Sequence, residues 1–485
     1  MKNSDFKVSV VKNGKVLLSN DPDWQAYSEN WLPTDTTVEE CPNMIFESVK
    51  SPSILKLLRH LQYVNKIRVV NNQLWLYKNC AGAWYAIPLS QEGVSIMKFI
   101  HPRTQQLVTT GQLKEVINRL KCIPTLQMTL DDFNAQNNLI SLKNGVLDVK
   151  TLTLKDKSSE YFFNYRLNTA YVPDVDWSNC PNFKKFCQTS LERDNKKIKL
   201  LLQIIGYLCS RCWGAKKAFL LVGEANCGKS VILELVKSII GSANVSNIPL
   251  HKLHERFSLA ALSDKMLNIH AELKSTPLRG LDVFKAIVSG DTLMGEHKGQ
   301  PHFSFSCRTK LLFAGNQMPD IAEAEASSAF ISRLCILRFP TEIAKENQDV
   351  NLLEKLKLEK NIIFSMAVRE MKELIENGYQ FAEPDDTRKF LNFYAEEQNH
   401  IKDFVENWCI LDPKMRITTK VLYQKYCEFC EMNCYKPYAV GKFSLYLSRI
   451  SGIAHLRFRE NGNAPARGYS GITVKTESAW HGTAR

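Results

Sequence analysis

FLLVGEANCGKS, residues 219–230, runs from an apolar stretch into a loop that is bounded by two glycines and closes on a lysine and a serine. It fits the pattern G-x-x-x-x-G-K-[ST], in which Gly223 and Gly228 are the two glycines. A triphosphate requires backbone N–H groups that turn inward, together with one ammonium and one hydroxyl beside Mg²⁺. The stretch therefore predicts a phosphate-binding loop, with Lys229 on the β- and γ-phosphates and Ser230 on the metal.

The residues on both sides of this loop fit the same interpretation. Residues 218–222 are an apolar run typical of a buried strand, and residues 231–240 have the spacing of an amphipathic helix. The motif requires a strand, a loop and a helix in that order, whereas an ordinary glycine turn would leave the lysine without a role. We therefore expect ATP and Mg²⁺ as ligands. The residues predicted to contact the nucleotide are Gly223, Glu224, Ala225, Asn226, Cys227, Gly228, Lys229 and Ser230.

The length and composition of the chain limit its class. With 485 residues, it has room for about three or four domains. Hydrophobic residues make up 44% and charged residues 23% of the chain. No apolar run approaches the roughly 18 residues of a membrane span, and the N-terminus lacks the apolar core of a secretory signal. These features predict a soluble, cytoplasmic protein without a membrane partner.

The chain is basic, with a formal net charge of +13 and a pI near 9.0, which favours an anionic partner such as nucleic acid. Its 14 cysteines are too sparse for a disulfide scaffold, so reduced thiols are expected. Cys209 and Cys212 have metal-ligand spacing, but they lie in the apolar, helix-like run IIGYLCSRCW with no second pair nearby. Cys427, Cys430 and Cys434 have helical spacing. For both groups, burial as small apolar residues is favoured over a zinc site.

The region before the loop alternates between strand and helix patterns. The predicted elements are a hairpin at 1–20, a helix at 53–61, a three-stranded meander at 67–87, a helix at 104–122, a hairpin at 138–154 and a helical collar or linker at 173–213. Four aromatic residues of the meander either stack on bases or fill the core of a small sheet, and we favour the core. These are Trp75, Tyr77, Trp84 and Tyr85.

Two more apolar strands are predicted after the loop. Residues 266–269 lead to Glu272, and residues 310–314 lead to Asn316. A carboxylate in such a position holds Mg²⁺ or orients the attacking water, and an amide can bind the water or the γ-phosphate. Parallel strands present their ligand site at their carboxyl ends, so we expect both side chains to lie near Lys229. Glu272 is thus a predicted catalytic residue and, with Ser230, a metal ligand.

Between these strands, turn residues predict a hairpin whose tip carries His297 and Lys298. A basic tip on an ATPase suits phosphate contacts with DNA, although a solvated loop is the simpler alternative. Arg333 precedes another apolar strand and is positioned to act as an arginine finger on the γ-phosphate of a neighbouring subunit. Arg338, on the same strand, is the other candidate for that role.

The C-terminal 85 residues are strongly basic, with 13 Lys and Arg against 7 Asp and Glu from residue 401 onward. A helix from Thr419, a helix at 440–450 and strands at 456–460 and 469–474 follow the order of a winged helix. The residues predicted to bind DNA there are Lys442 and Arg449 on the second helix and Arg457, Arg459 and Arg467 on the wing. Winged helices also bind proteins, so this alternative stays open.

The ordered set GEANCGKS, FKAIVSGD with its HKG tip, LLFAGNQMP and SRLCILRFP resembles the superfamily 3 helicases. Within them, the chain is similar to the phage and plasmid primase-helicase family that includes the poxvirus helicase-primase, over residues 50–480. The resemblance implies a homo-hexameric ring, ATP hydrolysis between subunits and 3′ to 5′ movement along single-stranded DNA. Two features depart from the family. Many relatives have paired acids where this chain has only Glu272, and in related viral helicases the tip has Lys before His.

The predicted fold is α/β, with a P-loop ATPase core of the AAA+ type. The expected domains are an α+β accessory domain at 1–125, a hairpin and helical collar at 126–215, the ATPase at 216–345, a helical lid at 346–400 and a winged helix at 401–485.

The leading functional hypothesis is an ATP-dependent DNA helicase for replication of a phage, plasmid or mobile element. Its expected partners are single-stranded and duplex DNA, with a primase or other replication proteins. One alternative is a bifunctional primase-helicase. It needs an acidic metal site, but the nearest acid pairs, Asp21/Asp23 and Asp174/Asp176, lie beside prolines in loop-like sequence. The other alternative is a DNA-binding ATPase switch or origin-recognition regulator that unwinds nothing.

Overall fold

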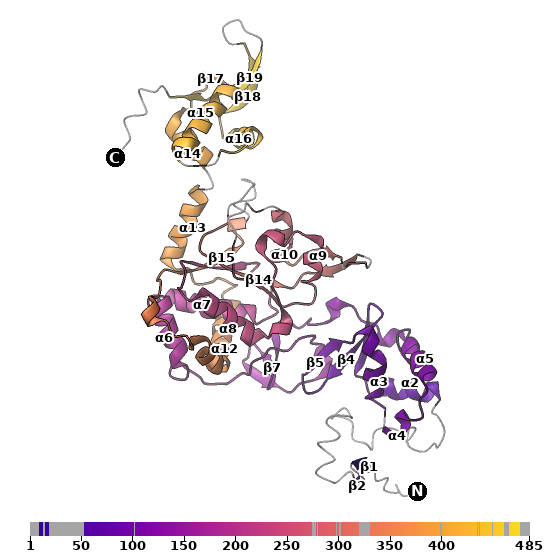
Figure 1. The fold of residues 1–485 in the computed structure, drawn as a ribbon. Coiled ribbons are helices and arrows are strands. Elements are labelled where there is room, and N and C mark those ends of the chain that lie inside the picture. Colours follow the sequence, from indigo (N-terminus) through magenta and orange to yellow (C-terminus); the bar gives the residue numbers. More distant parts are fainter. Residues whose placement is uncertain are drawn as a thin grey trace.

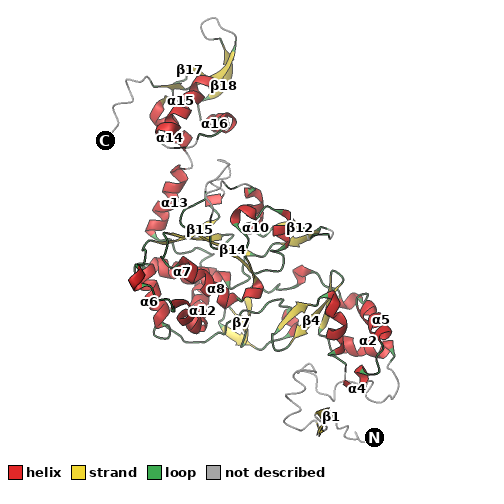
Figure 2. Cartoon of the chain, in the orientation of Figure 1, coloured by secondary structure: helices red, strands yellow, loops and turns green. Residues whose placement is uncertain are grey.

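The fold was analysed in a computed structural model of the whole chain (Figures 1 and 2). His297 and Arg449 lie outside the residues that the structure describes. The described residues are 9–12, 15–18, 53–100, 102–273, 278, 280–296, 298–299, 302–319, 330–397, 400–433, 435, 437–448, 450–459 and 465–475.

The centre of the molecule is a five-stranded sheet in which every neighbouring pair is parallel. Its strands, in spatial order, are β10 (Val245–Ser246), β11 (Leu267–His270), β14 (Lys310–Gly315), β9 (Ala218–Gly223) and β15 (Leu334–Phe339). Parallel strands are covered on both faces and are therefore apolar along most of their length, as the sequence of β9 and β14 shows. The predicted α/β class and the three predicted strands are confirmed.

Side chains of β9 alternate between two hydrophobic layers. Phe219 and Leu221 pack with the helices on one face, whereas Leu220 and Val222 pack with those on the other. The first layer contains α6 (Pro181–Ser190), α7 (Asn195–Leu208), α8 (Lys229–Ile240) and α12 (Leu352–Glu376). The second contains α9 (Arg256–Ala260) and α10 (Leu281–Ser289), and Figure 1 shows the two groups on opposite sides of the sheet.

Helix α12, within the predicted lid, packs closely on α7. A Cβ atom on Gly206 would lie 2.2 Å from the backbone oxygen of Ala367, so only glycine permits this approach. The carboxylate of Glu359 on α12 accepts hydrogen bonds from the backbone N–H groups of Asn182 and Phe183 at the start of α6, at 3.0 and 2.8 Å. The helices on either side of the ATPase sequence are therefore one packed unit with the sheet.

The N-terminal elements confirm the predicted meander. Strands β3 (Ile67–Val70), β4 (Gln73–Lys78) and β5 (Ala83–Ala86) form an antiparallel sheet beside α2 (Ile54–Tyr63), α3 (Glu92–Met97) and α5 (Thr110–Leu120) (Figure 2). Trp75, Tyr77 and Trp84 are at most 8% exposed, which confirms that they belong to the core. The short strands β1 (Ser9–Lys12) and β2 (Lys15–Leu18) pair antiparallel, as predicted.

The collar region confirms one prediction and corrects another. Strands β6 (Leu139–Leu142), β7 (Gly145–Asp148) and β8 (Thr153–Lys155) contain the predicted hairpin. The helix expected to continue through Cys212 instead ends at Leu208, because the Lys310 ammonium binds the backbone oxygens of Tyr207 and Ser210 there. Cys209 and Cys212 are buried, and burial raises the pKa of Cys209 to about 12.

The C-terminal elements share a separate hydrophobic core. Strands β17 (Arg416–Thr418), β19 (Ala466–Ser470) and β18 (Ala454–Phe458) form an antiparallel sheet against α14 (His400–Trp408), α15 (Thr419–Met432) and α16 (Val440–Leu447). The two-residue strands β16 (Cys409–Ile410) and β20 (Thr473–Val474) pair beside it. Before this core, the chain forms α13 (Asp385–Glu397), and α14 begins at His400. None of the described helices is long and apolar enough to cross a membrane.

Candidate functional site

The predicted phosphate-binding loop joins the end of β9 to the start of α8. Gly228 has a φ of 99°, and a Cβ atom there would lie 2.7 Å from Cε2 of Phe186. A Cβ atom on Gly223 would lie 2.3 Å from the backbone oxygen of Phe339. Both glycines of the motif are therefore required by close contacts, and Gly228 also by its left-handed backbone.

Lys229 is the first residue of α8 and is only 8% exposed. Its ammonium lies across the loop and donates hydrogen bonds to the backbone oxygens of Gly223 and Glu224, at 2.7 and 2.6 Å. Ser230 is exposed in the first turn of the same helix. The unsatisfied N–H groups of a helix N-terminus favour a negative charge, so the predicted anion position lies at the start of α8, where Lys229 and Ser230 are located.

The sheet register brings Asn316 to the same edge as the loop. Gly315 of β14 is paired with Val222 of β9, so Asn316 follows at the level of Gly223. Neighbouring strands lie only about 4.8 Å apart, and Asn316 is exposed at this edge. The predicted proximity of Asn316 to the start of the loop therefore follows from the observed pairing.

Glu272 lies one strand farther along the same edge. His270 of β11 is paired with Phe313 of β14, which places Glu272 level with Gly315. A Cβ atom on Gly315 would lie 2.9 Å from the side chain of Leu273, so this segment packs directly on the end of β14. The Glu272 carboxylate is on an exposed residue, and its backbone N–H donates to Nδ1 of His270 at 3.2 Å. Across the sheet from β9 to β14 to β11, the residues after the strand ends thus carry an ammonium, an amide and a carboxylate, in that spatial order.

Arg333 lies at the opposite edge of the sheet. Its backbone oxygen accepts a hydrogen bond of 2.8 Å from the N–H of Ala218, the first residue of β9. The loop begins six residues later, and at about 3.3 Å per residue the two ends of β9 are roughly 17 Å apart. Arg333 is therefore not placed to serve the loop of its own chain.

Arg338 is paired with Val222, immediately beside the loop. Its guanidinium lies 4.0 Å from Oδ2 of Asp386 and 4.8 Å from the ring centre of Phe390, both on α13. The two arginines proposed for the finger role therefore have different environments, and Arg338 is directed toward a helix of its own chain.

The predicted hairpin between the second and third motifs is present. Strands β12 (Thr292–Gly295) and β13 (Phe303–Ser306) pair antiparallel. Lys298 is exposed in the turn beyond them, next to Gly299, whose φ is 77°. Where the turn leaves the two strands, the Nδ1 atom of His302 lies 3.6 Å from Oε2 of Glu296. The two strands of the hairpin follow the prediction, and the contact of its tip with DNA stays a prediction.

Three of the predicted C-terminal arginines are exposed on or beside a β-ribbon. Arg457 of β18 is directly opposite Arg467 of β19, and both are exposed. Arg459 is exposed just beyond the end of β18, and Lys442 lies on α16. Like charges directly opposite each other destabilise a sheet, and an anionic ligand removes that repulsion. This ribbon is therefore a candidate phosphate-binding surface.

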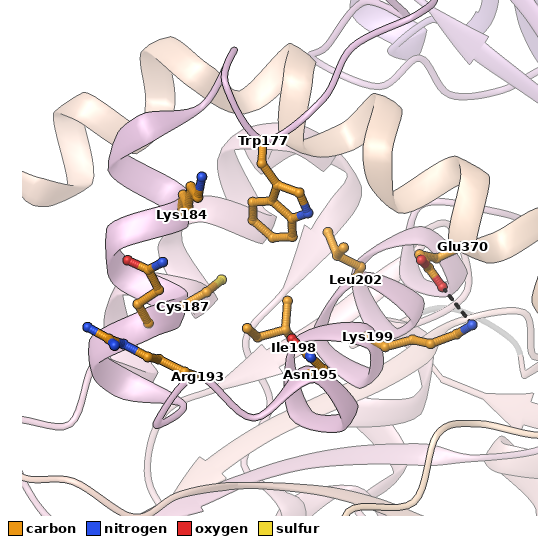
Figure 3. A pocket seen from close by; sticks show the side chains of 10 residues that line it. Trp177, Lys184, Cys187, Arg193, Asn195, Ile198, Lys199, Leu202 and Glu370 are labelled. Atoms are coloured by element: carbon orange, nitrogen blue, oxygen red, sulfur yellow. Dashed lines mark ion pairs between the residues drawn. The ribbon is translucent and has the colours of Figure 1, made fainter.

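A cavity of about 370 Å³ lies between α6, α7 and α12, and it contains none of the predicted site residues (Figure 3). Trp177, Cys187 and Leu202 form part of its wall, while Lys199 and Glu370 form an ion pair of 3.7 Å at one side. The residue next to Cys187, Phe186, contacts the loop glycine Gly228. This contact from the collar was not foreseen, since no motif marks a packing partner located about 40 residues upstream.

Three family models match separate parts of the chain. Residues 28–192 match the model described as "D5 N terminal like", and residues 396–459 match "Poxvirus D5 protein-like". Residues 221–333, which include the loop, match a family of unknown function, DUF5906. Two of the three descriptions name the D5 group, so the resemblance to the family of the poxvirus helicase-primase is confirmed.

Solved structures of the C-terminal region of NrS-1 are similar to this chain. One, described as its A form apo structure, has 11% identity and a TM-score of 0.48 and covers 85% of this chain and 98% of its own. Another apo structure of that region has 12% identity and a TM-score of 0.46, with 86% and 99% of the two chains covered.

Proposed function

We propose that the chain is an ATP-dependent DNA helicase that forms a ring and moves 3′ to 5′ along single-stranded DNA. The observation that carries this proposal is the division of charged and polar groups between the two edges of the sheet. Lys229, Asn316 and Glu272 follow the carboxyl ends of three strands, whereas Arg333 lies at the far ends. A site divided in this way is completed by the neighbouring subunit's Arg333, which supports a ring with nucleotides between subunits.

The groups at the carboxyl edge fit Mg²⁺ and ATP. Loop N–H groups and the Lys229 ammonium suit the β- and γ-phosphates, and the Ser230 hydroxyl with the Glu272 carboxylate supplies oxygen ligands of the kind that Mg²⁺ prefers. When bound, the metal neutralises charge that develops on the phosphates during hydrolysis. The Lys229 ammonium, now held by Gly223 and Glu224, would exchange these carbonyl contacts for phosphate oxygens.

In this proposal, Glu272 accepts a hydrogen bond from the attacking water and orients it toward the γ-phosphate. Asn316, on the adjoining strand, donates its amide hydrogens to the water or to a γ-phosphate oxygen. One carboxylate thereby does the work that relatives divide between paired acids. The AAA+ type of core is part of the same proposal, and the parallel five-stranded sheet supports it.

DNA is assigned to two separate surfaces. The exposed Lys298 at the hairpin tip would contact the backbone of the translocated single strand, together with His297. Duplex DNA would be held by a C-terminal winged helix, which the order α14, β17, α15, α16, β18 and β19 supports. The proposed domains keep the predicted boundaries at 1–125, 126–215, 216–345, 346–400 and 401–485.

Priming is the less favoured alternative because of the structure around Asp176. Its carboxylate accepts hydrogen bonds from the backbone N–H and the hydroxyl of Ser178, at 2.7 and 2.6 Å. These bonds lower its pKa and close a local turn before α6. These contacts give the Asp176 carboxylate a structural role that requires no catalytic metal. The other pair, Asp21/Asp23, lies outside the described residues.

Unwinding of a forked duplex with ATP and Mg²⁺, measured beside primer synthesis on single-stranded DNA, tests the proposal. A helicase unwinds the fork and makes no primer, whereas a primase-helicase does both. ATP hydrolysis and duplex binding without strand separation would instead identify the ATPase switch. The Lys229→Ala variant is the control for contaminating activities in each assay.

A further inference from the structure

Arg211 is a buried cation that lacks an acidic partner among the described residues. The side chain follows the end of α7 and is only 8% exposed, yet no ion pair joins its guanidinium to a carboxylate of the described residues. One of its nitrogens donates to the backbone oxygen of Arg308 at 3.4 Å, and its guanidinium lies 4.9 Å from the ring centre of Tyr165, while its buried Nε has no hydrogen-bond partner in this part of the chain. A guanidinium does not lose its proton in proteins, so the charge persists. Buried charges are normally paired because their desolvation is costly.

The surrounding charges increase this cost. Arg308 is exposed beside Arg211, and Lys310 is 3% exposed on the next strand. Burial, followed by the charge of Arg211 among other causes, lowers the pKa of Lys310 to about 7. The backbone oxygens of Tyr207 and Ser210 at the end of α7 are already bound by Lys310. The negative end of the helix dipole is therefore compensated by Lys310 and does not offset the charge of Arg211.

Both arginines line a cavity of about 190 Å³. Its wall comes from five separate parts of the chain: the segment at 130–137, Asn164, Arg211 at the end of the collar, Ser263, and the hairpin strand β13 with the residues after it. The side chains of Asn134, Asn137 and Asn164 add amide groups to the wall, where Nδ2 of Asn134 donates to Oδ1 of Asn164 at 2.6 Å. Among the described lining residues, the one acid is the exposed Asp131. Small-molecule sites usually measure roughly 300–1,000 Å³, so the space suits a small ion better than a nucleotide.

We propose that this cavity binds one phosphate-class oxyanion between Arg211 and Arg308. Guanidinium groups match phosphate oxygens with paired N–H donors, and asparagine amides complete the donor set. The anion would be held where the collar meets the base of the hairpin, because Phe305 and Ser306 of β13 form part of the wall. The site is separate from the nucleotide loop, which lies at the opposite edge of the sheet.

The experiment measures thermal stability in the Lys229→Ala background, so that the nucleotide loop does not contribute a phosphate response. The melting temperature of the purified full-length protein is compared in sodium phosphate, sodium sulfate and sodium chloride at equal ionic strength and pH. We expect phosphate and sulfate to raise it by about 2 °C or more relative to chloride. An equal melting temperature in all three salts overturns the proposal, unless the DNA measurement below gives a positive result.

Arg308→Gln is the decisive second substitution because its side chain is exposed, so folding does not depend on it. In chloride, this change removes a repulsive neighbour of Arg211 and leaves the melting temperature unchanged or higher. In phosphate, it removes an anion ligand and leaves the melting temperature lower than in the parent. Arg59→Gln, an exposed arginine on α2, is the matched control and retains the full phosphate response. Arg211→Met should abolish the response, and a phosphate response that persists unchanged in Arg308→Gln and Arg211→Met contradicts the proposal.

Free phosphate and the end of a DNA strand offer the same chemical group. Single-stranded oligonucleotides with and without a 5′-phosphate, compared by fluorescence anisotropy, separate these sources. Tighter binding of the phosphorylated strand that Arg308→Gln removes assigns a strand end as the ligand. Equal binding of both strands with a positive response to inorganic phosphate assigns the free ion. Absence of both responses rejects the site.

Discussion

The two edges of the central sheet differ in how well their functional candidates could be recognised from the sequence. At the carboxyl edge, a lysine, an amide and a carboxylate follow three strands, and each was recognisable from a short motif after an apolar run. At the other edge lie Arg333, the base of the hairpin and the buried Arg211. These groups come from segments far apart in the sequence. The proposed catalytic groups are therefore encoded locally in this chain, whereas the groups proposed for coupling and assembly are brought together only by the tertiary structure.

The largest expected effect belongs to the carboxyl edge. Lys229→Ala removes the ammonium that compensates phosphate charge in the transition state, so we expect kcat for ATP hydrolysis to fall by about 10³-fold or more. The measurement is phosphate release by the purified variant, with Lys237→Ala on the exposed face of α8 as the control. Unchanged turnover would show that the loop is not the catalytic nucleotide site.

Arg333→Ala tests the opposite edge and should lower hydrolysis by about 10³-fold, the usual effect of an arginine finger. The defect should act in trans. Rings that mix Arg333→Ala with Lys229→Ala subunits then contain some interfaces with both wild-type groups and regain part of the activity. If such mixed rings form and recover nothing, the proposed division of the site between subunits is wrong.

Glu272→Gln tests whether the carboxylate at the carboxyl edge acts in hydrolysis rather than in nucleotide binding. The amide keeps the size of the side chain but cannot act as a base, so kcat should fall about 10²-fold while the dissociation constant for ATP changes little. Nucleotide binding is measured by equilibrium titration and turnover by phosphate release. A wild-type rate would transfer the role to another acid, of which Asp264 is the next candidate.

Lys298→Ala tests whether the hairpin couples ATP hydrolysis to movement along DNA. Basal ATPase activity should persist because this residue lies outside the nucleotide site, while unwinding of a fork should fall by about tenfold or more. The salt dependence of single-strand binding should become shallower by about one ion per engaged subunit. His297→Ala should have a smaller effect, since a neutral imidazole binds phosphate more weakly at pH 7. Wild-type unwinding by Lys298→Ala would identify the tip as a solvated turn.

The smallest effect is expected on the C-terminal ribbon. Arg457→Gln should weaken duplex binding uniformly across sequences and reduce the salt slope by about one, without changing ATP hydrolysis. It also removes the repulsion with Arg467, so the melting temperature should not fall. Lys420→Gln, on a helix of the same core, is the control. An unchanged salt slope would favour a protein partner for this surface.

The sequence was sufficient for features that depend on neighbouring residues. The three motif strands, the hairpin at 292–306 and the buried aromatics of the meander follow from apolar spacing and turn residues. It was insufficient where distant groups compete for the same backbone. Lys310 binds the backbone oxygens of Tyr207 and Ser210 where α7 ends, and Phe186 fits against Gly228, yet neither contact has a local signal.

The length of β9 has a consequence for how the enzyme would be regulated. A separation of roughly 17 Å between Arg333 and the loop prevents a single chain from supplying its own finger. Under the proposed mechanism, the activity per molecule rises with protein concentration and is lost on dilution below the dissociation constant of the ring. Unassembled chains would therefore hydrolyse almost no ATP. Hydrolysis would be limited to assembled rings, which can enclose a DNA strand.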